Sequence, residues 1–442
     1  MKGKLVFVLC LFLLMSCLSF ARFAQPEAKA SSSLPVHNLS TGLNYSTIQD
    51  AINANETLDG QTIFVDAGTY YENVVVNKSI SLIGAVSGST IIDANGTGDA
   101  VEMSNNVTLS GFTLRNGGDG IQGGGENCYI SDNQIINNTY GINLECSVAT
   151  PTLDVITQNY IANSYVGIYA EESYNTTFTA NTIVNSSNKG VNLFASEYNT
   201  FYNNNFINNS VQVFNWGESG EWPNTWDNGN SSGGNYWSNG ENLYNNGGNY
   251  WNNSNNINND GFGNTPYNVG PYDVGNIDHY PLMGMFNSFN ATPQYSVETV
   301  CNSTISDFQF NGTAISFNVT GENGTTGFCR ITIPTAVING TLTVFVNGTE
   351  TPFTLLPESD SAQSCIFFTY HHSTQEVTIP EFPSFLILPL YLISTVLAAM
   401  IHKKRATRTI NHDFSRASTQ RKISNNLSSK KRALPSFLEK LI

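Results

Sequence analysis

The sequence Ser110-Gly-Phe-Thr-Leu114-Arg-Asn116-Gly-Gly-Asp-Gly120-Ile121 is followed by a second copy of the same pattern, Ser131-Asp-Asn133-Gln-Ile135-Ile-Asn137-Asn-Thr-Tyr-Gly141-Ile142, which aligns to it without a gap. Three further copies extend the pattern to Trp216. Repeats with a period of roughly 20–25 residues are typical of solenoids, in which each short block stacks on its neighbours. This stretch therefore decides the architecture.

Apolar residues form three columns when the five copies are stacked. The columns are Leu109, Ile130, Ile156, Phe178 and Phe201; Leu114, Ile135, Ile161, Ile183 and Phe206; and Ile121, Ile142, Ile168, Val191 and Val213. They are mostly β-branched or aromatic and are bounded by Gly, Asn and Ser, which predicts short strands and turns. One block cannot bury its own apolar face, so we expect coils about 4.8 Å apart around a continuous core. The predicted fold class is all-β, a right-handed parallel β-helix.

Asparagine recurs in two columns beside the apolar ones. One column is Asn133, Asn159, Asn181 and Asn204, and the other is Asn116, Asn137, Asn163, Asn185 and Asn208. Asparagine tolerates left-handed backbone angles at tight corners, and stacked amides can hydrogen-bond along the axis of stacking. We therefore expect a structural role, with an asparagine ladder at Asn116, Asn137, Asn163, Asn185 and Asn208.

Segments on both sides of the repeat resemble a known group of proteins. The N-terminal segments are Tyr45-Ser-Thr-Ile48-Gln-Asp-Ala-Ile52, Gln61-Thr-Ile-Phe-Val-Asp-Ala-Gly68-Thr-Tyr-Tyr-Glu72 and Ser79-Ile-Ser-Leu-Ile-Gly84, and those of the tail are Gly234-Asn235-Tyr236-Trp237, Asp260-Gly-Phe-Gly-Asn264-Thr-Pro-Tyr267 and Asp278-His-Tyr-Pro-Leu282. They resemble NosD-type and pectin-lyase-like carbohydrate-binding and sugar-hydrolase β-helix proteins. The resemblance covers about residues 40–285 and implies a β-helix at 40–215, capped at its start by a helix from Thr47 to Asn53. Because this fold hosts many functions, the resemblance predicts the fold better than the chemistry.

The ends of the chain predict export and membrane anchoring. Lys2 and Lys4 precede an apolar run, which predicts a signal peptide at residues 1–30. A second apolar run, Phe385 to Ile401, precedes His402-Lys-Lys-Arg405 and predicts a transmembrane helix at residues 383–402. The Pro-Glu-Phe motif before this run resembles archaeal surface-protein anchors. Residues 403–442 are then a basic cytoplasmic tail.

The charge distribution predicts the location and the partners. Residues 31–380 contain four Lys and Arg against 30 Asp and Glu, whereas the tail is basic. We therefore expect the β-helix at the cell surface, membrane lipid bound through the C-terminal helix and tail, and no nucleic-acid binding. The part outside the membrane contains 19 Asn-x-Ser/Thr sequons, which predict a glycoprotein without saying which sites are used.

Residues 292–380 are predicted to form a β-sandwich-like module. Alternating stretches such as Ile315-Ser-Phe-Asn-Val319 and Ile366-Phe-Phe-Thr-Tyr370 indicate strands. Cys128 and Cys146 lie in adjacent coils and are candidates for a disulfide, while the pairing of Cys301, Cys329 and Cys365 stays open.

Residues 216–287 are rich in Trp, Tyr, Asn and Gly and follow the last repeat. We expect them to cap the C-terminal end of the β-helix. Flat amphipathic rings beside amides also suit sugar recognition, which makes glycan the candidate ligand. The candidate ligand-binding residues are Trp222, Trp226, Tyr236, Trp237, Tyr250 and Trp251. In the tails that this segment resembles, the corresponding stretch is rich in Asp and is similar to a Ca²⁺ loop. The resemblance implies a candidate Ca²⁺ site at Asn258, Asp260 and Asn264, although neutral amides attract the ion less than carboxylates do, and no other cofactor is expected.

Catalytic chemistry has few candidates, and no catalytic residue is assigned. A lyase needs a base, for which Lys78, Arg115 and Lys189 are available, and a hydrolase needs paired acids. Glu145, Glu171 and Glu197 fall at similar places after the third apolar column and predict an acidic ridge. NosD proteins are also described as copper-binding, but copper prefers clustered His, Met or Cys, and His37, His279 and Met103 are far apart in the sequence.

These observations predict a membrane-anchored extracellular β-helix protein with a structural, adhesive or glycan-binding role. Its partners would be glycans or other surface proteins. The alternative is a polysaccharide lyase or hydrolase acting on acidic glycans. A non-enzymatic role is favoured, because the columns contain neither a base beside carboxylates nor a metal-ligand cluster.

Overall fold

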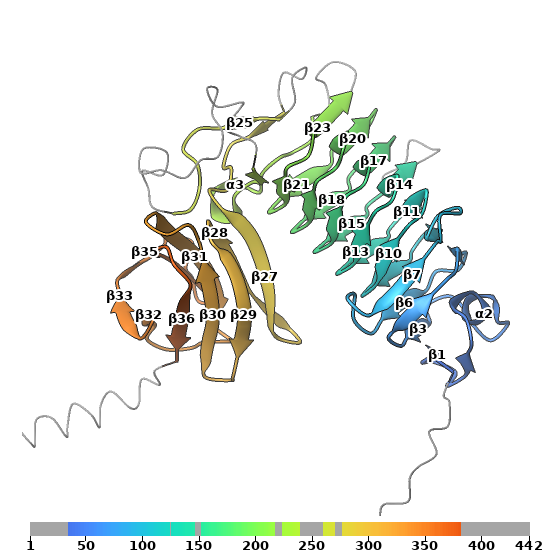
Figure 1. Ribbon diagram of the computed structural model, residues 1–442, viewed down its shortest axis with the longest axis horizontal. Coiled ribbons are helices and arrows are strands. Elements are labelled where there is room, and N and C mark those ends of the chain that lie inside the picture. The colour runs from blue at the N-terminus through green and yellow to red at the C-terminus, as the bar shows by residue number, and fades with distance from the viewer. Residues whose placement is uncertain are drawn as a thin grey trace, which may run out of the picture. The chain divides into compact units, whose positions relative to one another are not determined.

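The computed structural model describes residues 34–123, 125–145, 152–216, 223–238, 260–269 and 276–381. These residues divide into two compact units. Of the described residues, those up to Ser288 and Thr299–Asn302 belong to the first unit, and Phe289–Glu298 and those from Ser303 onward belong to the second. The first unit contains the repeats, and the second is built from antiparallel strands (Figure 1).

The first unit is the predicted right-handed parallel β-helix, and each of its coils contributes one strand to each of three sheets (Figure 1). The first sheet contains β3 (Thr62–Val65), β6 (Ser81–Gly84), β9 (Thr108–Ser110), β12 (Tyr129–Ser131), β15 (Val155–Thr157), β18 (Thr177–Thr179) and β21 (Thr200–Tyr202). The second contains β4 (Gly68–Tyr70), β7 (Thr90–Asp93), β10 (Thr113–Arg115), β13 (Gln134–Ile136), β16 (Tyr160–Ala162), β19 (Thr182–Val184), β22 (Asn205–Ile207) and β24 (Tyr236–Trp237). The third contains β5 (Val74–Val76), β8 (Val101–Met103), β11 (Asp119–Gly123), β14 (Tyr140–Glu145), β17 (Val166–Glu171), β20 (Lys189–Phe194) and β23 (Val211–Trp216), one strand for each of its 7 coils.

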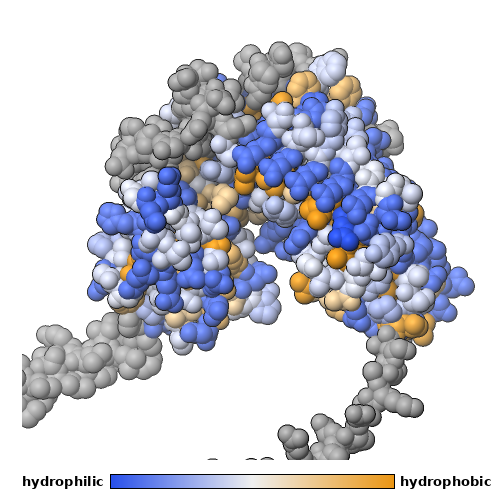
Figure 2. Space-filling model, viewed as in Figure 1, coloured by the Kyte–Doolittle hydropathy of each residue, from blue (hydrophilic) through white to orange (hydrophobic). Residues whose placement is uncertain are grey.

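The strand register confirms the three apolar columns. Leu114 pairs with Ile135, Ile135 with Ile161, and the same column continues to Phe206. The other two columns pair in the same way, from Leu109 to Phe201 and from Ile121 to Val213. All of these side chains are buried and form one continuous core. Figure 2 shows that the outside of the same coils carries a band of hydrophilic residues.

The asparagine ladder lies in the other column from the one predicted. It runs through the buried residues Asn133, Asn159, Asn181, Asn204 and Asn235, each of the first four donating from Nδ2 to Oδ1 of the next at 3.1, 3.0, 3.0 and 2.9 Å. The predicted ladder residues Asn116, Asn137, Asn163, Asn185 and Asn208 are instead exposed at the corner between the second and third sheets, with φ of 60, 59, 56, 56 and 51°. The Asn116 amide donates to Asp93 Oδ1 at 3.0 Å, and all five residues take the left-handed backbone conformation that asparagine tolerates.

The N-terminal end of the β-helix is closed by α2 (Ile48–Asn53) together with β1 (Val36–Asn38) and β2 (Asn44–Tyr45). Thr47 is the N-cap, and its side chain accepts a hydrogen bond from the backbone N–H of Asp50 at 3.0 Å. The carboxylate of Glu72 accepts hydrogen bonds from the backbone N–H groups of the first two helical residues, Ile48 at 3.1 Å and Gln49 at 3.0 Å. Ile48, Ala51 and Ile52 face the core, so the helix covers the apolar interior of the first coil.

The second unit contains most of two five-stranded sheets, of which two strands, β27 and β28, extend into the first unit. In these sheets β31 with β35 and β29 with β30 are antiparallel pairs. One sheet has β27 (Met285–Thr292), β28 (Tyr295–Cys301), β31 (Thr326–Pro334), β35 (Gln363–His371) and β34 (Phe353–Leu355). The other has β29 (Thr304–Phe310), β30 (Ala314–Thr320), β36 (Gln375–Pro380), β32 (Val344–Val346) and β33 (Thr349–Thr351). Rings of Phe289 and Phe308, from different sheets, stack at 4.6 Å, so the two sheets contact each other through aromatic side chains.

Several predicted features lie outside the described residues. They are the signal peptide at 1–30, the transmembrane helix at 383–402, the tail at 403–442, and Cys146 of the candidate disulfide. Cys128 is described and buried, with its thiol 3.2 Å from the carbonyl oxygen of Ser104. Among the described ranges, no helix is long and apolar enough to cross a membrane.

Candidate functional site

The two described tryptophans of the predicted aromatic site close the end of the β-helix. Trp226 and Trp237 are both 1% exposed, and their rings stack at 4.4 Å on Phe201 and Phe206, the last members of two apolar columns. Trp226 donates from Nε1 to Asn276 at 2.7 Å. Buried rings with satisfied N–H groups cannot stack on a sugar, so Trp226 and Trp237 belong to the cap and not to a ligand site.

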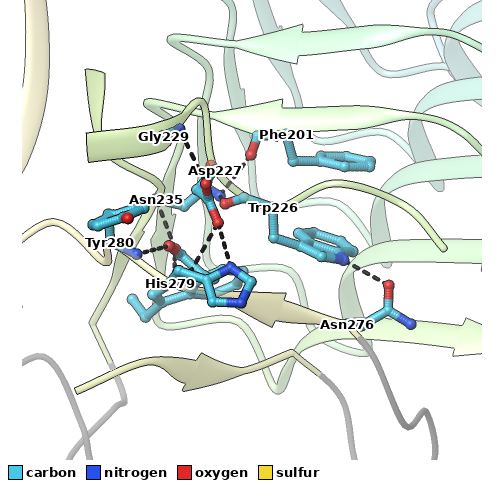
Figure 3. Close-up of polar contacts among 10 residues, drawn as sticks. Phe201, Trp226, Asp227, Gly229, Asn235, Asn276, His279 and Tyr280 are labelled. Atoms are coloured by element: carbon cyan, nitrogen blue, oxygen red, sulfur yellow. Dashed lines mark hydrogen bonds and ion pairs between the residues drawn. The ribbon is translucent and has the colours of Figure 1, made fainter. Parts of the chain in front are cut away.

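The same cap contains a network of carboxylates (Figure 3). Asp278 is buried and accepts hydrogen bonds from Trp237 Nε1 at 2.9 Å and from the backbone N–H of Asn235 at 2.8 Å. Burial raises the pKa of Asp278 to about 8, although these N–H donors favour its ionised form. Asp227, just before α3 (Gly229–Ser232), contacts His279 Nδ1 at 2.9 Å. These contacts join segments that are about 50 residues apart in sequence, so the network has a structural role.

The remaining residues predicted to bind ligands are only partly described. Tyr236 is half-buried in β24, whereas Trp222, Tyr250 and Trp251 lie outside the described residues. In the candidate Ca²⁺ site, Asp260 accepts the backbone N–H of Phe262 at 2.9 Å, Asn264 is exposed, and Asn258 lies outside the described residues. The calcium site therefore stays a prediction.

The three basic residues of the β-helix lie apart and already have partners. Arg115 Nε contacts Asp93 at 2.8 Å on the second sheet. Lys78 Nζ donates to the carbonyl oxygens of Ala54 and Thr57 at 2.9 and 2.8 Å, and so helps to fix the N-terminal cap. Only Lys189 lies on the third sheet, 4.5 Å from the centre of the Phe214 ring. Each of the three basic groups is thus held by its own partner, and no two of them share a site.

The outward side of the third sheet brings together residues that are far apart in the sequence. Its strands β14, β17, β20 and β23 lie side by side (Figure 1), and their register builds two rows along the coil axis. The rows are Asn143, Tyr169, Asn192 and Phe214, and Glu145, Glu171, Phe194 and Trp216. We call these rows, with Asp119, Tyr140 and Lys189 beside them, the third-sheet face.

Aromatic rings dominate the later coils of the third-sheet face. Tyr140 and Tyr169 lie 5.7 Å apart between ring centres, and Phe194 meets Trp216 edge to face at 5.6 Å. Phe194 is 38% exposed and Trp216 is 66% exposed. Phe194 and Trp216 contact each other and remain open to solvent, in contrast to the buried rings of the cap, whereas Tyr140 and Tyr169 are half-buried.

Carboxylates dominate its earlier coils. Asn143 donates from Nδ2 to Asp119 at 2.8 Å and to Glu145 at 3.3 Å, so one amide bridges two acids. Burial raises the pKa of Asp119 to about 6, and the nearby carboxylates of Asp99 and Glu145 act in the same direction. Tyr169 donates to Glu171 at 2.6 Å. The predicted acidic ridge is shorter than expected, because Glu171 pairs with Phe194 and Glu197 instead pairs with Tyr174.

This combination of groups suits a carbohydrate. Pyranose rings present apolar C–H faces that pack on aromatic rings, and hydroxyls that donate to carboxylates and accept from amides. The Asp119 and Glu145 pair also has the composition of a glycosidase centre, in which two carboxyl groups lie roughly 5–9 Å apart and one has a raised pKa. The recurrence of Glu145 and Glu171 in the repeat predicted the acidic part of this face, whereas its aromatic residues were not predicted.

The second unit contains a buried Ser–His contact. Ser303 Oγ lies 2.8 Å from His372 Nε2, and the other ring nitrogen contacts Thr325 Oγ1. Burial lowers the pKa of His372, which keeps the ring neutral. Because Ser303 is only 2% exposed, the contact joins the turn between β28 and β29 to the end of β35 and does not present a nucleophile to a substrate.

Comparison with known proteins agrees with this architecture. Residues 36–256 match the family model described as "Periplasmic copper-binding protein (NosD)". A protein named "Cell surface glycoprotein" from Methanothermus fervidus is 33% identical over 181 residues, which cover 38% of this chain and 30% of the relative. The chain thus matches less than a third of the relative's length.

The donor groups that the structure describes do not fit a copper ion. Within those ranges, no three His, Cys, Asp or Glu side chains come together as metal ligands. His37 lies at the N-terminal cap against Asp66 at 3.0 Å, and His279 lies at the C-terminal cap against Asp227. Copper prefers clustered imidazole and sulfur donors, and these two imidazoles sit at opposite ends of the β-helix.

Proposed function

This chain belongs to the NosD family of β-helix proteins, and from that premise we propose that it is a cell-surface glycoprotein whose third-sheet face binds glycan. The observation that carries the proposal is the exposed aromatic cluster of Phe194 and Trp216, in register with Glu145 and Glu171 on the neighbouring coils. An extended face along the coil axis suits an extended polymer better than a small molecule. The name of the Methanothermus relative supports the surface location.

The charge of the face supports a neutral or amino-sugar glycan. Four carboxylic acids lie on or beside it, at Asp99, Asp119, Glu145 and Glu171, against one cation, Lys189. The Lys189 ammonium already lies over the Phe214 ring, where the quadrupole of the ring attracts it. An acidic polysaccharide would meet like charge here, so the proposal departs from the acidic glycans that the alternative lyase or hydrolase would take.

The proposal includes anchoring of the chain by the apolar segment 383–402, with the β-helix outside the membrane. The charge asymmetry supports this orientation, since basic residues concentrate after that segment. Fractionation of source cells, followed by protease treatment of intact cells, tests it. Loss of the β-helix with retention of a membrane-bound tail fragment is expected, whereas protection of the β-helix would contradict the orientation.

A glycan array tests the ligand class. The purified residues 31–380 should bind neutral or amino-sugar oligomers and should bind polygalacturonate and other polyanions at least tenfold more weakly. The variant Trp216→Ala should lose most of the binding, while Tyr160→Ala, which removes a 45% exposed ring on the second sheet, should not. If both variants bound glycan as well as the unchanged protein does, the glycan would bind somewhere other than the third-sheet face.

The bridged pair of Asp119 and Glu145 favours a second candidate function, glycoside hydrolysis. In this function Asp119, with its pKa raised to about 6, would be the acid and Glu145 the ionised partner. Incubation of the protein with bound oligosaccharides should then release reducing ends, and Asp119→Asn should abolish the release. Binding without product in the unchanged protein supports the binding role alone.

A further inference from the structure

Three of the five corner asparagines between the second and third sheets begin Asn-x-Ser/Thr sequons. They are Asn137-Asn-Thr139, Asn185-Ser-Ser187 and Asn208-Asn-Ser210. The three occupy one structural position, since Asn137, Asn185 and Asn208 all follow a strand of the second sheet and share a φ between 51 and 59°. The repeat thus places three acceptor motifs along a single edge of the β-helix.

Each sequon presents its two chemically required residues to solvent. Asn137 and Thr139 are exposed, whereas Asn138 between them is 5% exposed and donates from Nδ2 to the Leu114 carbonyl oxygen at 3.2 Å. The other two sequons have the same exposed–buried–exposed pattern, with Ser186 and Asn209 buried. The buried middle residue anchors the tripeptide, so the acceptor amide and the hydroxyl point outward together.

The backbone of these acceptors is held by neighbouring coils. The N–H of Asn137 donates to the Ala162 carbonyl oxygen at 3.1 Å, and the N–H of Asn185 donates to that of Ile207 at 3.0 Å. The N–H of Asn208 donates to Ser238 Oγ at 2.8 Å. These bonds fix the corner without using the acceptor amides, which remain exposed on its outside.

Asn38 provides a contrast within the same unit. It also begins a sequon, Asn38-Leu-Ser40, but it is 0% exposed. Its Nδ2 donates to Thr57 Oγ1 at 3.0 Å and to Gln61 Oε1 at 2.8 Å. A glycan on this nitrogen would replace one of its two hydrogens, so it would break one of these bonds, and it would have no room at this buried position, so the folded protein cannot carry one there.

We propose that Asn137, Asn185 and Asn208 are N-glycosylated and form a ridge of glycans along the corner between the second and third sheets. In the transfer step, the side-chain nitrogen attacks the anomeric carbon of a lipid-phosphate-linked oligosaccharide. The nitrogen–carbon bond forms, the bond from carbon to phosphate oxygen breaks, the lipid phosphate leaves, and the amide releases one proton. The chain supplies the acceptor, and a membrane glycosyltransferase supplies the catalysis.

The ridge follows from the coil spacing. Asn185 and Asn208 lie on adjacent coils, about 5 Å apart, and Asn137 lies two coils from Asn185, about 10 Å away. The ridge borders the starting edge of the strands that form the third-sheet face. Glycans would therefore cover this corner and leave the two rows of the face open. This inference rests on the surface location in the proposed function, but not on ligand binding by the face.

Glycopeptide mass spectrometry of the full chain, isolated from the membranes of its source cells, tests the proposal. Asn137, Asn185 and Asn208 should carry glycan, and Asn38 should be unmodified. The single variants Thr139→Ala, Ser187→Ala and Ser210→Ala should each remove the glycan at one site only. Glycan at other sequons but none at these three corners would overturn the inference, whereas a complete absence of glycan would instead contradict the surface location.

Asn163 provides a gain-of-site test that does not depend on the loss variants. It occupies the same corner, is exposed and has a φ of 56°, but its third residue is the 52% exposed Tyr165. The variant Tyr165→Thr completes a sequon without changing a buried side chain, so Asn163 should become glycosylated. Tyr165→Ala is the matched control and should leave Asn163 unmodified. A correctly folded Tyr165→Thr chain without glycan at Asn163 would contradict the proposal.

Discussion

Asn181 Oδ1 accepts two hydrogen bonds from Asn159 in the preceding coil, one from its backbone N–H and one from its side-chain Nδ2, both at 3.0 Å. Asn181 then donates from its own Nδ2 to the carbonyl oxygen of Ile156 at 2.7 Å and to Asn204 at 3.0 Å. The side-chain oxygen and nitrogen of Asn181 thus both have partners in neighbouring coils. The ladder links successive coils where their strands do not pair.

Replacing one ladder residue should destabilise the β-helix. Asn181→Ala leaves the backbone N–H of Asn159 without its acceptor and the carbonyl oxygen of Ile156 without its side-chain donor, and these losses should cost about 3 kcal/mol in total. For a unit of this size, the unfolding midpoint should fall by roughly 6–12 °C, as measured by calorimetry. Asn163→Gly is the control, because glycine tolerates the left-handed φ of 56° at that exposed corner. Equal effects of the two variants would show that the ladder does not stabilise the fold.

Asp154 should make the β-helix less stable as pH rises. It is 3% exposed and accepts the N–H of Cys128 at 2.7 Å, as Asn199 does for Thr176 at 2.9 Å two coils later. Burial raises the pKa of Asp154 from 3.8 to about 7, so the folded state holds a proton that the unfolded state releases. The unfavourable contribution of Asp154 to the free energy of folding is therefore absent below its pKa in the unfolded state, 3.8. It grows as pH rises and is complete above its pKa in the folded state, about 7.

Asp154→Asn tests this effect, because the amide cannot ionise. The variant should unfold at nearly the same temperature as the unchanged protein near pH 4. Near pH 8 it should be more stable by about 2–4 kcal/mol. The measurement is the unfolding midpoint of both proteins across this range. A stability difference between the two proteins that stays constant with pH would contradict the raised pKa assigned to Asp154.

Close approach of glycines should make one corner intolerant of any side chain. A Cβ on Gly167 would lie 2.5 Å from the carbonyl oxygen of Gly190 in the next coil, and one on Gly141 would lie 2.4 Å from that of Gly167. Gly167→Ala should therefore force the coils apart and lower stability by about 1–3 kcal/mol. Gly88→Ala, where no atom lies within 4 Å, should change the midpoint little. An unchanged unfolding midpoint in Gly167→Ala would instead show that the spacing between the coils can increase to make room for the methyl group.

The fold could be predicted because its information is local and repeated. Ile135, Ile161 and Ile183 recur at one place in each copy, and the strands pair at these residues as expected. The ladder was harder to assign, because the same residue type fills two columns for different reasons. Asn181 is buried and needs amide partners, whereas Asn185 lies four residues later, is exposed and needs only a left-handed backbone. Composition alone does not separate these two requirements.

The third-sheet face was less predictable, because it depends on register. Glu171 pairs with Phe194, and the next strand then brings Trp216 beside Phe194. The sequence alignment instead matched Glu171 with Glu197 because both are glutamates. Glu197 lies three residues after Phe194, the true partner of Glu171. The tryptophans of the C-terminal cap were misleading for another reason. Trp226 and Trp237 have the composition of a sugar site, but closing the last coil requires large apolar rings that are buried.

Calorimetric titration of residues 31–380 with the strongest-binding neutral or amino-sugar oligomer from the array tests the central claim most directly. The account predicts saturable binding that weakens about tenfold in Trp216→Ala, since the loss of one stacked ring corresponds to about 1.4 kcal/mol. Tyr160→Ala should bind like the unchanged protein. Unchanged affinity in a folded Trp216→Ala protein, or binding only to polyanionic glycans, would contradict the assignment of the third-sheet face.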